Sequence, residues 1–186
     1  MVLNLAILAI YLSFSLDFII WPISSEASTK SLIKVKNEHS LLKSFGLIAV
    51  FLANLIFYLA PLALAIQGLL ASDEAGMRSL PLVGVLLAIV GRLLSLKGTL
   101  ILRANTQSTL VTTSIFKRSR NPISTGMHLT ILGLVLCFGQ WYLWLGLVLY
   151  ILNIHLKIKI EEKFLLNLHG PFYRDYVLKT PRYLIW

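Results

Sequence analysis

The sequence predicts an all-α, polytopic integral membrane protein of about five transmembrane helices, with a short hairpin before a cytoplasmic C-terminal tail. Three observations predict this class: an apolar composition, a series of long apolar segments, and basic residues confined to alternate connections. Hydrophobic residues make up 57% of the 186 positions and charged residues only 13%, whereas soluble domains average about 45–50% and 25%. The chain has too few polar residues to cover a water-facing globule, and its length suits a single membrane domain, residues 1–186.

The N-terminal part contains three segments that are each long enough to cross a bilayer, which takes about 20 apolar residues. They span residues 2–23, 44–70 and 80–102. Pro61 lies inside the second segment, where we expect a kink, and Arg92 and Lys97 interrupt the third. A signal peptide is the alternative for the first segment, but that segment has neither a basic start nor an Ala-x-Ala cleavage pattern.

A fourth apolar stretch, residues 126–156, follows a polar connection. Two full spans would need about 40 residues, so this stretch is too short for two ordinary crossings. Gly139 and Gln140 interrupt it near the middle. This break predicts a tight hairpin of two short helices, and one very long tilted helix is the alternative.

Basic residues predict the orientation of the chain. Fourteen of the 17 Lys and Arg residues lie in the connection 23–44, in the connection 103–125 or in the tail from residue 157 onward. Arg78 is the single basic residue in the connections of the other side. Because Lys and Arg concentrate in cytoplasmic loops, we expect the N-terminus outside and the C-terminus in the cytoplasm.

Polar groups gather in two segments that the hairpin should bring together, residues 109–122 and 157–176. Glu161 and Glu162 in the second segment need cationic partners or water beside a membrane. Arg120 in the first segment is the natural partner, because the two short helices share one turn. Taken alone, each feature has an ordinary explanation: a solvated helix face, a positive-inside anchor, or an interfacial aromatic belt.

The order of these features is more specific than any one of them. The pattern starts at Leu110-Val111-Thr112-Thr113, continues with Phe116 and Arg120-Asn121-Pro122, and after the hairpin gives Glu161-Glu162, Gly170, Tyr173, Tyr176 and Pro181-Arg182-Tyr183. This pattern, over about residues 98–186, resembles the isoprenylcysteine carboxyl methyltransferase family and the wider phospholipid and protein methyltransferases of membranes. The resemblance implies that S-adenosylmethionine lies in a cytoplasm-facing pocket roofed by the C-terminal tail, and that a lipid-linked acceptor enters from the bilayer.

The resemblance also implies roles for particular residues, so that residues 103–186 would form the catalytic region. Arg120 and Glu161 would be the polar pair at the reacting end, and Lys157, with Glu161, would face the acceptor. Glu161 is also the candidate base for an amine or thiol acceptor, whereas a carboxylate acceptor needs none. The implied cofactor contacts are Ser108, Thr109, Leu110, Val111, Phe116, Asn121, Pro122, Ile123, Ser124, Glu162, Tyr173 and Tyr176.

Four positions depart from the family pattern. Ser124 stands where the family has Tyr, Ser114 where it usually has Gly, and Ser108 where His is frequent. Lys157 replaces an Arg and so loses the planar two-pronged donor of a guanidinium. We interpret these departures as a change in the acceptor or in the contact with the cofactor ribose.

Arg92 has two interpretations that the sequence leaves open. It lies about ten residues from the end of its segment, roughly 15 Å deep at 1.5 Å per residue. A charged side chain at that depth indicates a functional site. Arg92 either binds the headgroup of the acceptor or pairs with another helix.

Other functions remain as alternatives. A membrane reductase of the steroid-reductase kind that uses NADPH shares the expected layout, and a non-catalytic family member would bind neither cofactor. A transporter would usually show internal repeats, and none is found. We expect no metal site, since the four histidines lack ligand spacing. We also expect no nucleic-acid partner. Membrane lipids and a lipid or lipid-modified acceptor are the expected partners, and the oligomeric state is left open.

Overall fold

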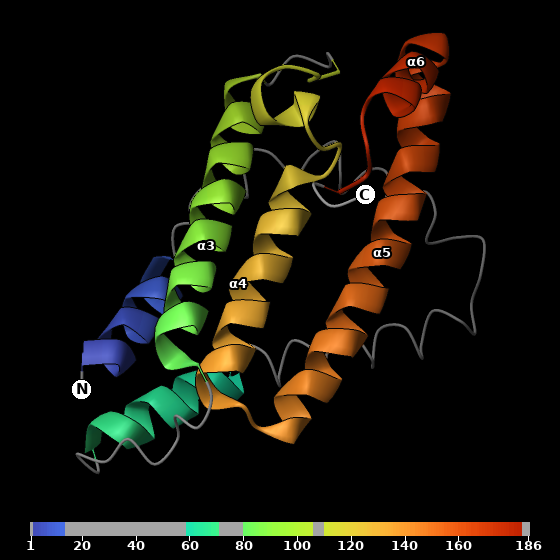
Figure 1. Ribbon diagram of the computed structural model, residues 1–186. Helices are drawn as coiled ribbons and strands as arrows, with labels where there is room; N and C mark the ends of the chain where they lie inside the picture. The colour runs from blue at the N-terminus through green and yellow to red at the C-terminus, as the bar shows by residue number, and fades with distance from the viewer. Residues whose placement is uncertain (1, 14–58, 71–79, 106–109, 184–186) are drawn as a thin grey trace.

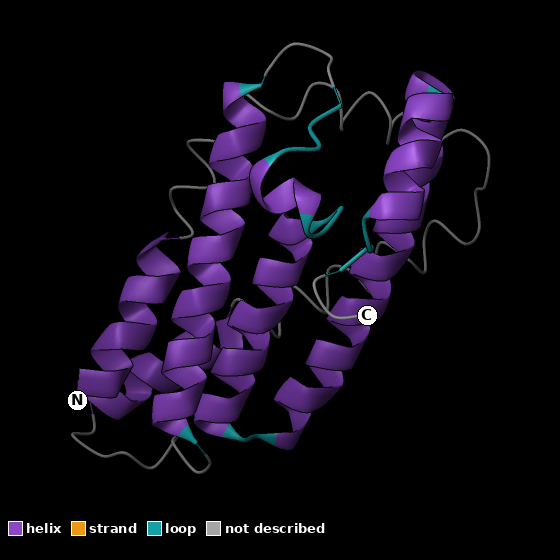
Figure 2. Cartoon of the chain, turned by 45° about the horizontal axis from the view of Figure 1, so that its top comes forward, coloured by secondary structure: helices purple, strands orange, loops and turns teal. Residues whose placement is uncertain are grey.

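The computed structural model describes residues 2–13, 59–70, 80–105 and 110–183. All regular structure in these residues is helical (Figures 1 and 2). The principal helices are α3 (Pro81–Ala104), α4 (Pro122–Phe138), α5 (Trp141–His169) and α6 (Pro171–Lys179), with the short 3₁₀ helix η1 (Ser114–Lys117) before α4. Two shorter apolar helical segments, Val2–Ser13 and Leu59–Leu70, precede them.

Local sequence signals set the helix boundaries. Proline occupies the first helical position of α3, α4 and α6, where its missing N–H costs nothing and its fixed φ suits the helix. Gly139 ends α4 in the left-handed conformation, with φ 64°, which glycine adopts without a steric penalty. The predicted break at Gly139 and Gln140 is confirmed, and the alternative of one long tilted helix is wrong. The expectation of two short helices is wrong for α5, which has 29 residues because the helix continues past the apolar stretch into the polar segment.

Helices α3 and α4 lie side by side because both carry glycines on their facing sides (Figure 1). A Cβ added to Gly91 would lie 2.5 Å from the carbonyl oxygen of Gly126, and one added to Gly126 would lie 2.5 Å from that of Gly91. Gly84 and Gly133 approach each other in the same reciprocal way. Small residues allow this close backbone approach, which provides the packing between helices within a membrane.

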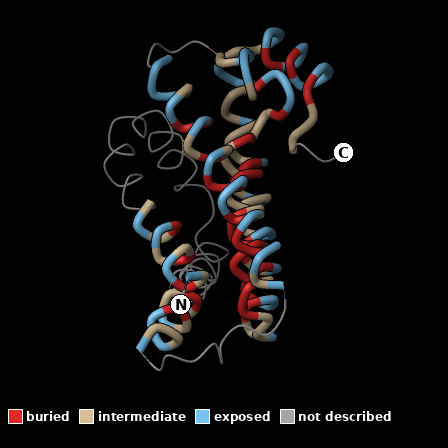
Figure 3. Tube along the Cα trace, turned by 60° about the vertical axis from the view of Figure 1, so that its left-hand side comes forward, coloured by how far each residue is buried: buried red, intermediate tan, exposed pale blue. Residues whose placement is uncertain are grey.

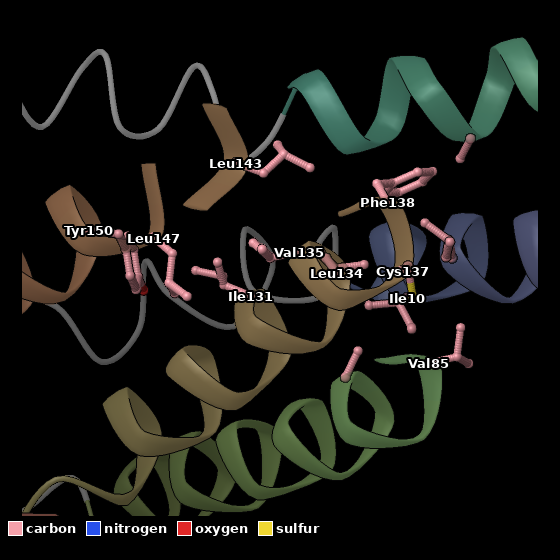
Figure 4. Packing of buried hydrophobic residues seen from close by; sticks show 13 residues of the cluster. Ile10, Val85, Ile131, Leu134, Val135, Cys137, Phe138, Leu143, Leu147 and Tyr150 are labelled. Atoms are coloured by element: carbon pink, nitrogen blue, oxygen red, sulfur yellow. The ribbon is translucent and has the colours of Figure 1, made fainter. Parts of the chain in front are cut away.

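The buried apolar side chains form one core that joins α3, α4, α5 and the segment Val2–Ser13. Figure 4 shows Phe138, Leu134 and Val135 of α4 among side chains of the neighbouring helices. Figure 3 shows that buried positions lie where helices face one another, while exposed positions lie on their outer sides. Several of the outer side chains of α3 are apolar, among them Leu82, Leu86, Leu93 and Leu100. An apolar outer surface suits contact with lipid chains.

Among the described helices, α3 and α5 are long and apolar enough to cross a membrane by length and composition. Helix α4 has 17 residues and is shorter, as the hairpin prediction implied. The predicted segment 80–102 agrees with α3 to within two residues. Of the segments predicted at 2–23 and 44–70, residues 14–23 and 44–58 lie outside the described residues. The chain preceding Leu59, on the N-terminal side of Pro61 where a kink is expected, is part of this range, so five spans stay a prediction.

Candidate active site

Three segments meet at the carboxylate of Glu162 on the far part of α5. Arg120, which lies just before α4, contacts Oε1 of Glu162 through Nε and Nη2, each at 3.1 Å. Arg182, from the chain after α6, donates to both carboxylate oxygens, with Nη2 at 2.6 Å from Oε2. The three side chains are 8%, 14% and 31% exposed for Arg120, Glu162 and Arg182. Charge-assisted contacts of this two-pronged kind are stronger and more directional than neutral ones.

Arg120 also holds the end of α6. Its Nη1 donates to the carbonyl oxygens of Val177 and Thr180, both at 2.9 Å. Its backbone N–H donates to the carbonyl oxygen of Pro181, also at 2.9 Å. The last carbonyls of a helix have no partner within the helix and carry partial negative charge, so a cation there is favourable. Arg120 therefore joins the chain just before the start of α4 to α5 and α6.

The two guanidinium groups determine the ionisation of Glu162, which lies beyond the apolar part of α5 (residues 141–156). Burial alone would raise its pKa, but the hydrogen bond from Arg182 and the positive charges of Arg120 and Arg182 hold the pKa below its usual value. The carboxylate is thus kept charged and fully engaged. This makes Glu162 an anchor for the two arginines and a poor proton acceptor.

The residues beside Arg120 complete the attachment of the C-terminal segment, which lies between α4 and α5 (Figures 1 and 2). Ser119 is fully buried, and its hydroxyl donates to the carbonyl oxygen of Arg182 at 3.2 Å. The same hydroxyl oxygen accepts from the backbone N–H of Asn121 at 3.1 Å. The amide of Asn121 donates to the carbonyl oxygen of Arg182 at 3.3 Å. Residues 119–121 therefore form a cradle for the backbone of the tail.

A buried aromatic group lies next to this junction. Tyr176 donates its hydroxyl proton to the carbonyl oxygen of Phe116 at 2.6 Å, and the rings of Tyr173 and Tyr176 meet edge to face at 6.1 Å. All three side chains are buried. Burial raises the pKa of both tyrosines to about 12, with the charge of Glu162 adding to the rise at Tyr173 and Tyr173 itself adding to it at Tyr176. Both hydroxyls therefore stay protonated at physiological pH.

The structure brings the two predicted polar segments together but changes the pairing of their charges. Arg120 contacts Glu162, not Glu161, so the expectation that Arg120 and Glu161 form the direct pair is wrong. Adjacent residues of a helix point about 100° apart, and Glu161 instead forms a salt bridge with Lys157 one turn earlier, at 3.5 Å. Lys157 and Glu161 lie on a different and more exposed side of α5 than Glu162.

Arg92 lies in a contact between helices. Its side chain is 3% exposed, and its Nε donates to the hydroxyl of Ser13 at 2.6 Å while Nη2 donates to the Ser13 carbonyl oxygen. Of the two interpretations that the sequence left open, these contacts favour the structural pair with another helix. A role for Arg92 in binding the acceptor stays a prediction.

The other predicted cofactor residues lie before η1 and at the start of α4. Ser108 and Thr109 lie outside the described residues. Leu110 and Val111 are half-buried and precede η1, while Ile123 and Ser124 are half-buried in the first turn of α4. Hollows in the surface at residues 63–70 and 93–104 are not lined by residues of the junction.

The backbone at Ser114 gives a physical reason for the glycine of the family pattern at this position. Its φ is 56°, in the left-handed region, which costs an L-residue with a side chain about 1–2 kcal/mol and costs glycine almost nothing. The resemblance gives glycine at this position. The chain therefore keeps the left-handed turn that leads into η1, and the side chain of Ser114 makes this turn less favourable than glycine would.

Sequence reasoning missed three participants in the site: Arg182, Ser119 and Tyr183. The motif Pro181-Arg182-Tyr183 was part of the resemblance but received no role. Its composition suggested only an interfacial belt, whereas Arg182 binds Glu162 and the Tyr183 hydroxyl lies 2.9 Å from Nδ1 of His155. Ser119 gave no signal in the sequence, because a buried serine is recognisable only from its contacts.

The fold and the junction define a class: a helical membrane protein whose polar residues meet at one end of the hairpin of α4 and α5. The family model named phospholipid methyltransferase matches residues 79–171, which is half of the chain. The chain belongs to the phospholipid methyltransferase family, and the predicted membership among membrane methyltransferases is confirmed. The match extends from α3 through α5 to the start of α6 and ends before Arg182. No curated protein matches the chain significantly.

Proposed function

We propose that this protein transfers a methyl group from S-adenosylmethionine to a hydrophobic or lipid-linked acceptor at the cytoplasmic face of a membrane. The observation that carries the proposal is the junction at Glu162, which joins the family segment 119–122, helix α5 and the tail. Family membership supplies the reaction class. The proposal includes the acceptor that the resemblance suggests, a prenylated cysteine.

The residues present fit this cofactor. Phe116, Tyr173 and Tyr176 provide buried aromatic surface, which suits a purine ring. Backbone groups at Leu110 and Val111 would bind the adenine edge, and Asn121 to Ser124 would line the same entrance. When bound, the cofactor supplies a methyl group on a sulfonium, whose positive charge is lost on transfer. A dry site with fixed dipoles stabilises that spreading of charge.

The protein's own residues would hold the two reactants in line, and positioning supplies much of the rate in such transfers. Arg120 and Glu162 fix the entrance to α4 against α5 and the tail. Lys157 and Glu161, on the neighbouring side of α5, are in a position to orient a polar headgroup. The acceptor would reach them from the bilayer along the outer side of α5, where Leu152 and Leu156 are exposed.

Cofactor binding tests the proposal directly. Replacing Asn121 and Pro122 together by alanine should abolish S-adenosylmethionine binding, because the cradle for the tail and the start of α4 are lost. Isothermal calorimetry of the purified protein in detergent measures the affinity, and insertion into membranes is checked by fractionation.

Two results would contradict the proposal. The first is unchanged affinity in the double variant, which would place the cofactor elsewhere. The second is binding of NADPH but not S-adenosylmethionine by the unaltered protein, which would favour the reductase. The matched control is the pair Asp175→Ala with Arg174→Ala on the exposed side of α6, which should leave the affinity unchanged.

A further inference from the structure

One buried polar atom between α4 and α5 has no hydrogen-bond partner among the described residues. Nε2 of His128 is the one buried side-chain nitrogen or oxygen without a hydrogen bond in the part of the chain that the structure describes. An unpaired buried polar atom costs about 1–3 kcal/mol, and such atoms are rare enough in native proteins that each needs an explanation.

The surroundings of His128 form a small polar group within an otherwise apolar hairpin. Its ring meets that of Tyr150 on α5 edge to face, with centroids 5.6 Å apart, and lies 5.8 Å from that of Tyr183. The Tyr183 hydroxyl lies 2.9 Å from Nδ1 of His155, which is also on α5. The group therefore contains side chains from α4, α5 and the tail.

This group lies directly inward of the proposed active site. His128 follows Ser124 by one helical turn, so both lie on the same side of α4, and Ser124 is the last residue of the proposed cofactor segment. Tyr183 follows Arg182, which is bound to Glu162. At 1.5 Å per residue, His128 is about 9 Å along α4 from its start and His155 is about 10 Å along α5 from Glu162. His128 and His155 therefore lie at a similar depth on the two helices, and an acceptor arriving from the bilayer would pass between α4 and α5 at that depth.

The carboxylates at the junction already have cationic partners. Glu162 is engaged by two arginines, and Glu161 is bound to Lys157 on the more exposed side of α5. A neutral imidazole offers one nitrogen that accepts a proton, and a general base must lie within hydrogen-bond reach of the proton that it removes.

We propose that His128, with Tyr183 and His155, forms the seat of the acceptor's reacting group, and that Nε2 of His128 takes its proton. This rests on the proposed function and specifies the acceptor class: a nucleophile that carries an exchangeable proton, namely an amine, a thiol or a hydroxyl, and not a carboxylate. The nucleophile bonds to the methyl carbon, the carbon–sulfur bond breaks with its electron pair left on sulfur, and the proton passes to Nε2. The sulfonium becomes a neutral thioether and His128 becomes an imidazolium.

The experiment uses the full chain in vesicles made from a membrane lipid extract, with S-adenosylmethionine carrying a tritiated methyl group. The labelled product is then treated with mild alkali, which releases methyl esters as volatile methanol but leaves methyl groups on nitrogen, sulfur or ether oxygen in place. We expect the label to survive. Release as methanol would mean a carboxylate acceptor, which needs no base, and would overturn the inference while the proposed function stands.

The variants His128→Gln and His128→Ala test the residue itself, with His169→Gln at the end of α5 as the control. We expect His128→Gln to lower turnover by about 10²-fold, the scale of a positioned base. Affinity for S-adenosylhomocysteine by calorimetry should change by less than about threefold. Added imidazole should restore part of the turnover of His128→Ala but have no effect on the unaltered protein, which a purely structural role would not produce.

Three outcomes are distinguishable. Near-normal turnover in His128→Gln, or no rescue by imidazole in a folded His128→Ala, overturns the inference and assigns the unpaired nitrogen to packing or bound water. Loss of cofactor affinity in His128→Gln also overturns it, since the residue would then act on the cofactor side. If the unaltered protein neither binds S-adenosylmethionine nor labels any lipid, the proposed function fails and the inference with it.

Discussion

Glu162 illustrates how a shift of one position along a helix changes the chemistry of a site. Two adjacent glutamates on α5 look equivalent in sequence, yet Glu162 faces the arginines of the α4 entrance and the tail while Glu161 faces Lys157. The difference is the 100° step between neighbours in a helix. Ile158, which is buried, lies four residues before Glu162 on the same side, and it marks the side of α5 that packs inward.

The first prediction compares these two glutamates. Glu162→Gln should release the tail, because the amide keeps the shape of the carboxylate but loses the charge that binds two arginines. Hydrogen bonds to charged groups contribute about 1.5–3 kcal/mol, so cleavage by trypsin at Lys179 and Arg182 should speed up by roughly tenfold or more. Glu161→Gln is the matched control and should leave the cleavage rate nearly unchanged. Equal protection of the tail in both variants would show that Glu162 does not hold it.

The second prediction concerns Ser114. Ser114→Gly should stabilise the protein by about 0.5–1 kcal/mol, because the relief of the left-handed backbone exceeds the entropy that glycine adds to the unfolded chain. Thr113→Gly, at an ordinary φ of −100°, should destabilise it. The single, buried Cys137 allows the melting temperature to be measured with a thiol-reactive dye. A lower melting temperature for Ser114→Gly would contradict the account of the backbone here.

At the scale of elements, the glycines decide how α3 and α4 pack. Helices in lipid gain little from burying apolar surface against each other, so close contact between backbones matters more. The reciprocal approach at Gly91 with Gly126 and at Gly84 with Gly133 spans two turns of each helix. This fixes the start of α4, and thereby Arg120, relative to the rest of the bundle.

The third prediction tests this packing. Gly91→Ala should lower the melting temperature, because its Cβ would meet backbone atoms of Gly126 and Thr130 at 2.5 Å and overpacking costs about 1–3 kcal/mol. Gly98→Ala is the control, since its Cβ would meet the side chain of Ile123, which can move aside. The melting temperatures of both variants are measured by labelling Cys137 with the dye during heating. Equal melting temperatures for the two variants would refute the backbone contact.

At the scale of the whole molecule, the tail and the hairpin form one unit with the site between them. The C-terminal segment returns from α6 and lies between α4 and α5 (Figure 1). Since the cofactor is supplied by the cytosol, the proposed function requires this end of the hairpin to face the cytoplasm. The distribution of basic residues predicts the same orientation.

The fourth prediction is therefore topological. A reporter fused to the C-terminus should read cytoplasmic, and a reporter inserted in residues 71–79 should read external. Fusions of alkaline phosphatase and of green fluorescent protein give opposite signals on the two sides and so control for each other. A reversed pair of readings would place the junction at Glu162 away from the cofactor supply and would end the proposal for the site.

The sequence by itself determined the helical membrane class, the hairpin at Gly139 and the approach of the α4 entrance to the distal part of α5. These follow from length, hydropathy and turn chemistry, which are local properties of the chain. Only the tertiary structure decided that Glu162 rather than Glu161 binds Arg120, that Arg92 contacts Ser13, and that Arg182 and Tyr183 return between α4 and α5. Which side of a helix faces inward, and what the non-helical residues 181–183 touch, depend on how distant segments pack, and no local pattern encodes that.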